Sequence, residues 1–140
     1  GTEIGPSGPA PSVATSLEGQ ATAASGTYTL TSVVATDAVA VNGVTFTAVA
    51  SGATGNQFNV GVSDTATATN LAAAINASAT ALVSGYVTAS SAATVVTVTA
   101  VQKGLAGNVY TITSADGTIV ASGARLTGGA ADPTAITLSF

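Results

Sequence analysis

Residues 38–49 read AVAVNGVTFTAV, two runs with period-two alternation on either side of Asn42-Gly43. A two-residue type I′ turn needs positive φ at both central positions, and Asn followed by Gly adopts these angles more easily than other pairs. Alternation with period two is typical of a strand that buries one face. The stretch therefore predicts a β-hairpin and, with it, a fold built mainly from strands.

Strand-like runs recur along the chain on both sides of this hairpin. They cover residues 27–31, 57–60, 82–89, 94–101, 108–113, 118–121 and 134–140. Asp116-Gly117 predicts a second tight turn before the run at 118–121. We expect a mainly β (α+β) fold, either a compact antiparallel β-sandwich or a sheet, with one short helix packed on it.

One segment has the period of a helix. In residues 63–76, SDTATATNLAAAIN, apolar side chains recur at the spacing i, i+3, i+4 and i+7. These positions are Ala68, Leu71, Ala72 and Ile75. Ser63 or Asp64 is suited to cap the first turn. We expect a helix over about 64–77, and its narrow stripe of small residues predicts that it lies close against a sheet.

The two ends of the chain differ from the middle, which predicts three parts. Residues 1–26 hold three of the four prolines, Pro6, Pro9 and Pro11, and show no hydrophobic period, so we expect an extended N-terminal arm. Such a segment either lacks a fixed structure or lies along a neighbouring subunit. Residues 27–129 form the β-rich module that holds the helix, and residues 130–140 form a C-terminal strand.

The C-terminal run TAITLSF alternates through residue 140. It places Ile136, Leu138 and Phe140 on one face and Ala135 on the other. An apolar strand at an edge seeks a partner, so it either closes the sheet of its own chain or adds to the sheet of another subunit. The candidate assembly residues are therefore Pro6, Pro9 and Pro11 in the arm and Ile136, Leu138 and Phe140 in the strand.

The composition argues against several classes of function. The chain has no His, Cys, Met or Trp, its only basic residues are Lys103 and Arg125, and its net charge is −4. A protein that binds nucleic acid needs several Lys or Arg on one face, so we expect no nucleic-acid partner. No apolar run approaches the roughly 18 residues of a membrane span, so we expect no membrane partner. Only 6% of residues are charged, which favours packed assembly because few strongly hydrated groups must be covered.

Six carboxylates are candidates for acid or base catalysis: Glu3, Glu18, Asp37, Asp64, Asp116 and Asp132. Catalysis by paired carboxylates needs two of them at a fixed separation in a pocket, whereas these lie in the arm, in turns and at the helix start. A hydroxyl nucleophile needs a base beside it, and Lys103 lacks the Ser-x-x-Lys spacing because residue 100 is Ala. No run of alternating Asp and Asn marks a calcium loop. We expect no enzyme activity, no cofactor and no metal site.

Six segments between Ala38 and Gly129 form a familiar series. They are VNGVTFTAV at 41–49, GNQF at 55–58, DTATATNLAAAIN at 64–76, VVTVTA at 95–100, KGLAGN at 103–108 and LTGG at 126–129. The series resembles a small module of bacteriophage virion proteins, notably within the tail sheath proteins of Mu-like phages. The resemblance implies a compact sheet-and-helix module displayed outside a virion, with no catalytic residues to carry over. A sheath subunit is several times longer and has a contractile core that this chain lacks.

A free-standing copy of such a module is more similar to a decoration or cement protein. We therefore expect a non-enzymatic virion structural protein on the exterior surface of a capsid or tail, whose partners are other copies and the major capsid or tail protein. The alternative is a secreted or cell-surface filament or adhesion module. Carbohydrate binding would need exposed aromatic residues in a groove, and for Tyr28, Tyr86 and Tyr110 we expect buried packing instead.

Overall fold

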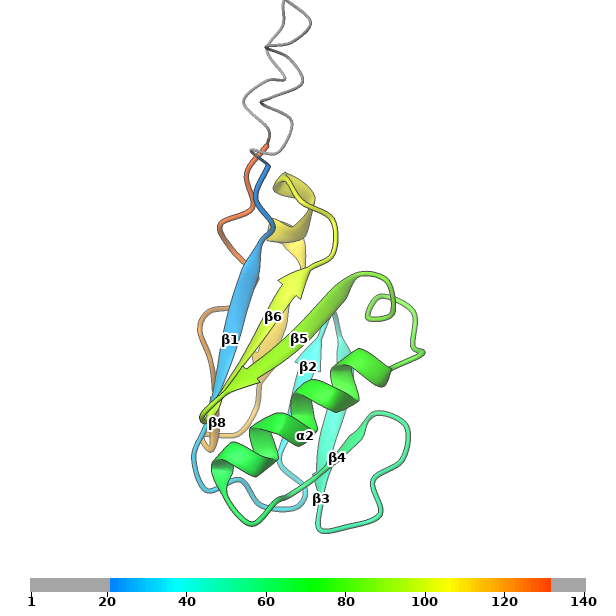
Figure 1. Ribbon diagram of the computed structural model, residues 1–140, viewed down its shortest axis with the longest axis vertical. Helices are drawn as coiled ribbons and strands as arrows, with labels where there is room; N and C mark the ends of the chain where they lie inside the picture. The colour runs from blue at the N-terminus through cyan, green and yellow to red at the C-terminus, as the bar shows by residue number, and fades with distance from the viewer. Residues whose placement is uncertain (1–20, 132–140) are drawn as a thin grey trace, which may run out of the picture.

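Eight strands form two four-stranded sheets in the computed structural model, which describes residues 21–131 (Figure 1). The strands are β1 (Ser25–Leu30), β2 (Ala38–Val41), β3 (Val44–Val49), β4 (Gln57–Asn59), β5 (Val87–Ala92), β6 (Val95–Ala100), β7 (Ile112–Ser114) and β8 (Ile119–Ala121). One sheet has the order β5-β6-β1-β8 and the other the order β4-β3-β2-β7. Helix α2 (Asp64–Ala77) and the 3₁₀-helix η2 (Leu105–Val109) accompany them. The predicted mainly β fold with one packed helix is confirmed.

Strands β2 and β3 form the hairpin that the sequence predicts. Asn42 and Gly43 have φ values of 49° and 80°, as a type I′ turn requires. Val41 lies opposite Val44, so the loop contains only these two residues. The local turn chemistry therefore sets the register of the whole hairpin.

The pairing of β4 departs from the antiparallel prediction. This strand runs parallel to β3, with Gln57 beside Thr47. The connecting loop, residues 50–56, returns the chain to the middle of β3, and Asn59 Oδ1 stabilises the loop by accepting from the N–H of Ala53 (3.0 Å). Parallel pairing follows from this loop path, which the period-two pattern of the strand does not encode.

Apolar side chains of both sheets meet in one interior. The largest fully buried side chains include Tyr28, Leu30, Phe46, Phe58, Leu71, Ile75, Ile112, Ile119 and Leu126. Tyr28 of β1 reaches across to the other sheet, where its hydroxyl donates to the carbonyl of Ala40 in β2 (2.8 Å). The bond gives a polar partner to a ring that is otherwise surrounded by apolar atoms.

Helix α2 packs mainly on β5 and β4, the edge strands on one side of the two sheets (Figure 1). Ser63 is its N-cap, because its Oγ accepts from the N–H of Ala66 (3.1 Å). The predicted apolar stripe is the buried face: Ala68, Leu71, Ala72 and Ile75. Asp64 has a different role from capping, since its Oδ1 accepts from the N–H of Ser32 (2.8 Å) and ties the helix start to the loop after β1.

The strand predicted at 82–89 is wrong in its first half, because the chain turns there and β5 begins at Val87. Gly85 has a φ of 80°, a left-handed conformation that interrupts an extended chain. The carbonyl of Val83 accepts the N–H groups of Tyr86 (3.0 Å) and Val87 (3.2 Å) and closes the turn.

The strand predicted at 108–113 is also wrong in its first half, where η2 ends, and β7 covers only Ile112–Ser114. Gly107 accounts for the difference. A Cβ on this residue would lie 2.6 Å from the Cβ of Ala100 and 3.0 Å from that of Ala24. The chain therefore turns in η2 with its backbone pressed against β6 and the start of β1, an approach that only glycine allows.

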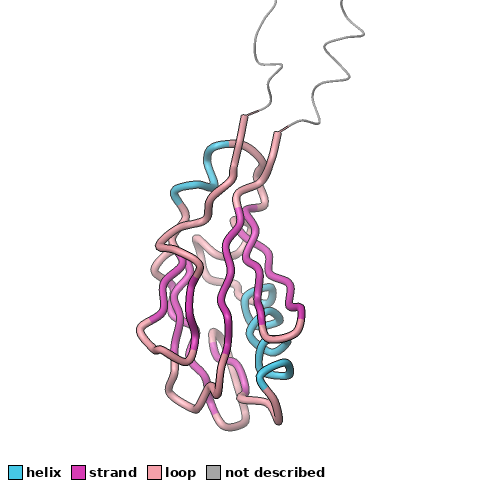
Figure 2. Tube along the Cα trace, turned by 90° about the vertical axis from the view of Figure 1, so that its left-hand side faces the viewer, coloured by secondary structure: helices cyan, strands magenta, loops and turns pink. Residues whose placement is uncertain are grey.

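The folded module begins before residue 27, so the predicted boundary of the arm at residue 26 is wrong. Ala24 is buried, β1 starts at Ser25, and Thr22 exchanges two backbone hydrogen bonds with Ala130 (3.0 and 3.1 Å). Ala130 likewise belongs to the module and not to a separate C-terminal strand. The first and last described segments of the chain lie side by side at the same end of the sandwich (Figure 2).

The candidate assembly residues of the arm and of the terminal strand lie outside the described residues. They are Pro6, Pro9, Pro11, Ile136, Leu138 and Phe140.

Burial of Tyr28 makes stability depend on pH. Burial raises the pKa of this phenol above its ordinary value of about 10, and a backbone hydrogen bond from Thr113 lowers it by less. Above pH 10 the unfolded chain therefore releases the proton first, and stability should fall by up to about 1.4 kcal/mol for each pH unit. Urea unfolding below and above this pH should show the fall in the wild type and in Tyr86→Phe. It should be absent from Tyr28→Phe, and an equal fall in all three proteins would contradict the assignment.

Candidate assembly surfaces

Two aspartates join the sheets at the end of the sandwich that holds the turn after β7. Asp116 Oδ2 accepts from the N–H of Ala38 (2.8 Å), at the start of β2. Asp37 Oδ2 accepts from the N–H of Val34 (3.0 Å) and from the hydroxyl of Thr118. Both carboxylates therefore have a structural role, because they accept hydrogen bonds that fix the chain before β2 and around the turn after β7. For Asp116 this agrees with the turn that the sequence predicts at Asp116-Gly117.

The other ionisable residues are scattered. Lys103 and Arg125 are exposed, while Glu3, Glu18 and Asp132 lie outside the described residues. Within residues 21–131, no three or more His, Cys, Asp or Glu side chains gather in a way that could hold a metal ion. The surfaces that remain to be considered are apolar.

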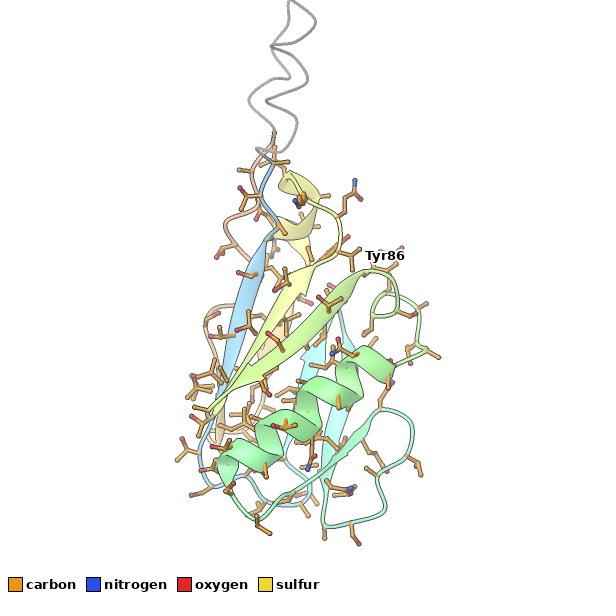
Figure 3. All side chains as sticks on the ribbon, viewed as in Figure 1. Tyr86 is labelled. Atoms are coloured by element: carbon orange, nitrogen blue, oxygen red, sulfur yellow. The ribbon has the colours of Figure 1, made fainter. Side chains whose placement is uncertain are left out.

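Five large apolar side chains stay exposed toward one end of the sandwich, and we call them the apolar end. They are Leu82, Tyr86, Val101, Leu105 and Val109, which are 42–63% exposed. Tyr86, labelled in Figure 3, accepts a backbone hydrogen bond from Val101 (2.9 Å) and meets the ring of Tyr110 edge-on, with 5.8 Å between centroids. These contacts bring together the turn before β5, the turn after β6 and η2.

The described ends of the chain lie beside the apolar end. The carbonyl of Thr22 accepts the N–H groups of Gly104 (2.9 Å) and Ala130 (3.1 Å). The side-chain amide of Asn108 donates to the carbonyl of Gly129 (2.9 Å) and accepts from its N–H (2.8 Å). Helix η2 is therefore fixed between the first and last described segments, next to the points from which the arm and the terminal segment continue.

Sequence reasoning missed the apolar end. Buried packing is confirmed for Tyr28 but is wrong for Tyr86, which is 42% exposed. Leu105 stands in the glycine-rich stretch that precedes the strand predicted at 108–113 and has no strand or helix period, so for Leu105 a signal was available, whereas Val109 was assigned to that strand. A large apolar residue that no periodic pattern assigns to a core is a candidate for contact with a partner.

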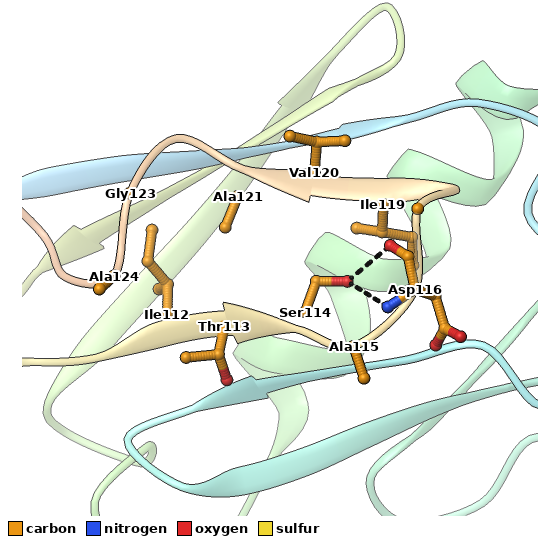
Figure 4. A pocket seen from close by; sticks show the side chains of 11 residues that line it. Ile112, Thr113, Ser114, Ala115, Asp116, Ile119, Val120, Ala121, Gly123 and Ala124 are labelled. Atoms are coloured by element: carbon orange, nitrogen blue, oxygen red, sulfur yellow. Dashed lines mark hydrogen bonds between the residues drawn. The ribbon is translucent and has the colours of Figure 1, made fainter.

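A groove of about 440 Å³ between β7 and β8 is the second candidate surface (Figure 4). Ile112 and Ser114 of β7 and Ile119 and Ala121 of β8 point into it (Figure 4). The Ser114 hydroxyl donates to the carbonyl of Asp116 (3.1 Å) and accepts from its N–H (3.2 Å), so the turn already uses it. Asp116 is the one ionisable residue in the lining, and the groove is otherwise uncharged.

The described part of the chain contains no helix that is long and apolar enough to cross a membrane. The apolar end and the groove are two features of residues 21–131 that suggest contact with a partner. No protein-family model matches this chain, and no curated protein matches it.

Proposed function

We propose that this chain is a non-enzymatic structural protein of a bacteriophage virion, a decoration or cement protein on the outside of the capsid or tail. The observation that supports it best is the apolar end, where five large apolar side chains stay exposed and η2, which carries two of them, lies beside both described ends of the chain. Single exposed apolar residues are common on any surface, but a group of them marks a contact site. We infer that the apolar end faces the major capsid or tail protein.

The electrostatic character of the chain supports the same proposal. Charged residues make up 6% of the sequence, and the described aspartates Asp37, Asp64 and Asp116 all accept hydrogen bonds from the chain's own backbone. Few charges must therefore lose water when the surface is covered. Weak apolar contacts then add up when many copies bind one lattice.

The rigidity of the apolar end also favours a binding role. Helix η2 carries Leu105 and Val109, and the Asn108–Gly129 pair and the Thr22–Gly104 bond fix it to the body. A surface that is already ordered before contact loses less conformational entropy on binding. Every copy of the chain would therefore present the same ordered surface to its partner.

The alternative is a secreted or cell-surface filament or adhesion module. Among the described strands β8 pairs only with β1, and this edge favours the alternative because filaments can grow by pairing sheet edges. This alternative predicts self-association without binding to phage particles.

The double variant Leu105→Asp/Val109→Asp tests the virion proposal. Both side chains are 63% exposed, so the variant should fold like the wild type. Against a capsid or tail protein, however, the two new carboxylates would be buried without partners. We expect incorporation into purified particles, measured by quantitative mass spectrometry, to fall at least about tenfold, the effect of roughly 1.4 kcal/mol.

Val62→Asp is the control, because Val62 is fully exposed near the start of α2, at the opposite end of the sandwich. Its incorporation should equal that of the wild type. Particles that contain the double variant at the wild-type level would show that the apolar end is not the contact surface. Particles without the wild-type chain would overturn the proposed function.

A further inference from the structure

The apolar end lies beside the last described segment of the chain. Gly129 is pressed against η2, because a Cβ on this residue would collide with the carbonyl oxygen of Gly104 and lie 2.9 Å from Asn108 Oδ1. Leu105 follows the first of these residues and Val109 follows the second, and both side chains are 63% exposed. The part of the chain that follows Gly129 therefore starts next to the apolar end.

We propose that residues 134–140 of the same chain fold back over the apolar end, cover it in the free protein, and are displaced when the partner binds. The inference rests on the proposed function, since it names the regulation of the surface that faces the capsid or tail protein. Three properties of this segment support it: its chemistry, its reach and its attachment.

The segment TAITLSF has the chemistry that the apolar end requires. It contains no charged side chain and no proline, and its alternation puts Ile136, Leu138 and Phe140 on one face. Contact through this face would remove apolar atoms of both partners from water, while the hydroxyl groups between them stay solvated. Residues 1–20 hold two glutamates and three prolines, so they match the apolar end less well.

The segment is long enough to cross the apolar end. Residues 134–140 span about 20 Å when extended, at roughly 3.3 Å per residue. The apolar end is narrow, because direct contacts join its parts. Val109 precedes Tyr110, whose ring meets that of Tyr86 with 5.8 Å between centroids. The carbonyl of Tyr86 in turn accepts from the N–H of Val101 (2.9 Å).

Attachment to the same chain favours this segment over a separate molecule. Residues 130–133 alone separate it from Gly129, and Asp132-Pro133 is a pair that favours a turn. Closing so short a connection costs little entropy, and an attached segment acts at an effective concentration of about millimolar. A second copy of the chain in dilute solution is far below this concentration, so the chain's own segment occupies the apolar end first.

The cover is of a kind that a partner can displace. Seven residues lose conformational freedom when they become ordered, and this loss opposes the gain from burying three apolar side chains. A partner whose surface is already ordered has no comparable loss and therefore competes for the apolar end. In the free protein, the cover would keep the five exposed apolar side chains from non-specific contacts.

Engineered cysteines test the contact, because the chain has no cysteine of its own. The full-length variant Leu105→Cys/Leu138→Cys, kept dilute in a glutathione redox buffer, should form a disulfide within one chain. Adding Ile136→Asn/Phe140→Asn should slow its formation at least about tenfold, because the effective concentration of the segment at the apolar end falls. Asparagine is used because Lys103, two residues from Leu105, would attract a carboxylate.

The matched control is Thr137→Asn/Ser139→Asn, which changes the opposite face of the same segment and should leave the rate unchanged. Equal slowing in both backgrounds, slowing in neither, or no disulfide within one chain would overturn the inference. A disulfide that joins two chains, seen as twice the mass of 13.1 kDa, would assign the cover to a second copy and overturn it as well. Circular dichroism checks that every variant is folded.

Binding to phage particles tests the displacement. The cysteine-free variant Ile136→Asn/Phe140→Asn should bind at least about threefold more tightly than the wild type, because a covered surface binds only in proportion to its open fraction. Equal or weaker binding by this variant would overturn the inference. The disulfide measurement needs no particle, so its failure would leave the proposed function standing. If the disulfide forms as expected but neither the wild type nor the variant binds particles, the proposed function alone is refuted.

Discussion

Replacing Phe46 with alanine is expected to lower the free energy of unfolding by about 3–5 kcal/mol. The ring is fully buried on β3, an inner strand with β2 on one side and β4 on the other. Most other residues of the buried core are Val, Ile, Leu and Ala, which are too small to fill the space that the ring would leave. A domain of this size is stable by only about 5–15 kcal/mol, so the loss is a large share of the total.

Urea unfolding followed by circular dichroism measures this change, with Tyr86→Ala as the control. Tyr86 has a ring of similar size but is 42% exposed, so its loss should cost about 1 kcal/mol. Equal losses for the two variants would show that the two sheets do not enclose a common core around Phe46.

The second large effect is expected from Leu71→Ala in α2, with a loss of about 2.7–5 kcal/mol. Leu71 is fully buried in the middle of the stripe that faces β5 and β4. The helix stripe otherwise consists of Ala68, Ala72 and Ile75, so Leu71 supplies much of its buried apolar area. Without this contact the helix should loosen from the two edge strands, and amide hydrogen exchange in residues 64–77 should rise.

Leu105→Ala is the matched control because it makes the same chemical change at a site that is 63% exposed. Its stability should remain within about 0.5 kcal/mol of the wild type. If Leu71→Ala left both stability and exchange unchanged, the packing of α2 on the sheets would be contradicted.

The elements that were predictable from sequence are those decided by neighbouring residues. Asn42-Gly43 sets the hairpin through its own φ preferences. Ser63 and the stripe that contains Leu71 set the start and the buried face of α2 within one segment of chain. No contact with a distant segment is needed to explain either element.

The elements that were mispredicted depend on distant contacts. Helix η2 replaces a predicted strand because Gly107 packs against Ala24 and Ala100, which come from other parts of the chain. The Asp116-Gly117 turn was predicted correctly, but a turn signal does not state which sheets its strands join. β7 and β8 in fact enter different sheets, and the groove exists for that reason.

The sequence predicts what kind of surface the chain has but not where on the fold that surface lies. The low charge and the absence of His and Cys indicate a surface suited to contact, but they do not locate it. The exposure of Leu105 and Val109 depends on η2, and hence on the same distant contacts of Gly107. The predicted contributions of the arm and of Ile136, Leu138 and Phe140 concern residues outside the described range and remain predictions.

Electron cryomicroscopy of purified phage particles tests the central claim most directly. The map should show this chain in many copies on the outer surface of the capsid or tail, with Leu105 and Val109 turned toward the underlying protein. Particles of full infectivity whose outer surface lacks this chain would contradict that claim.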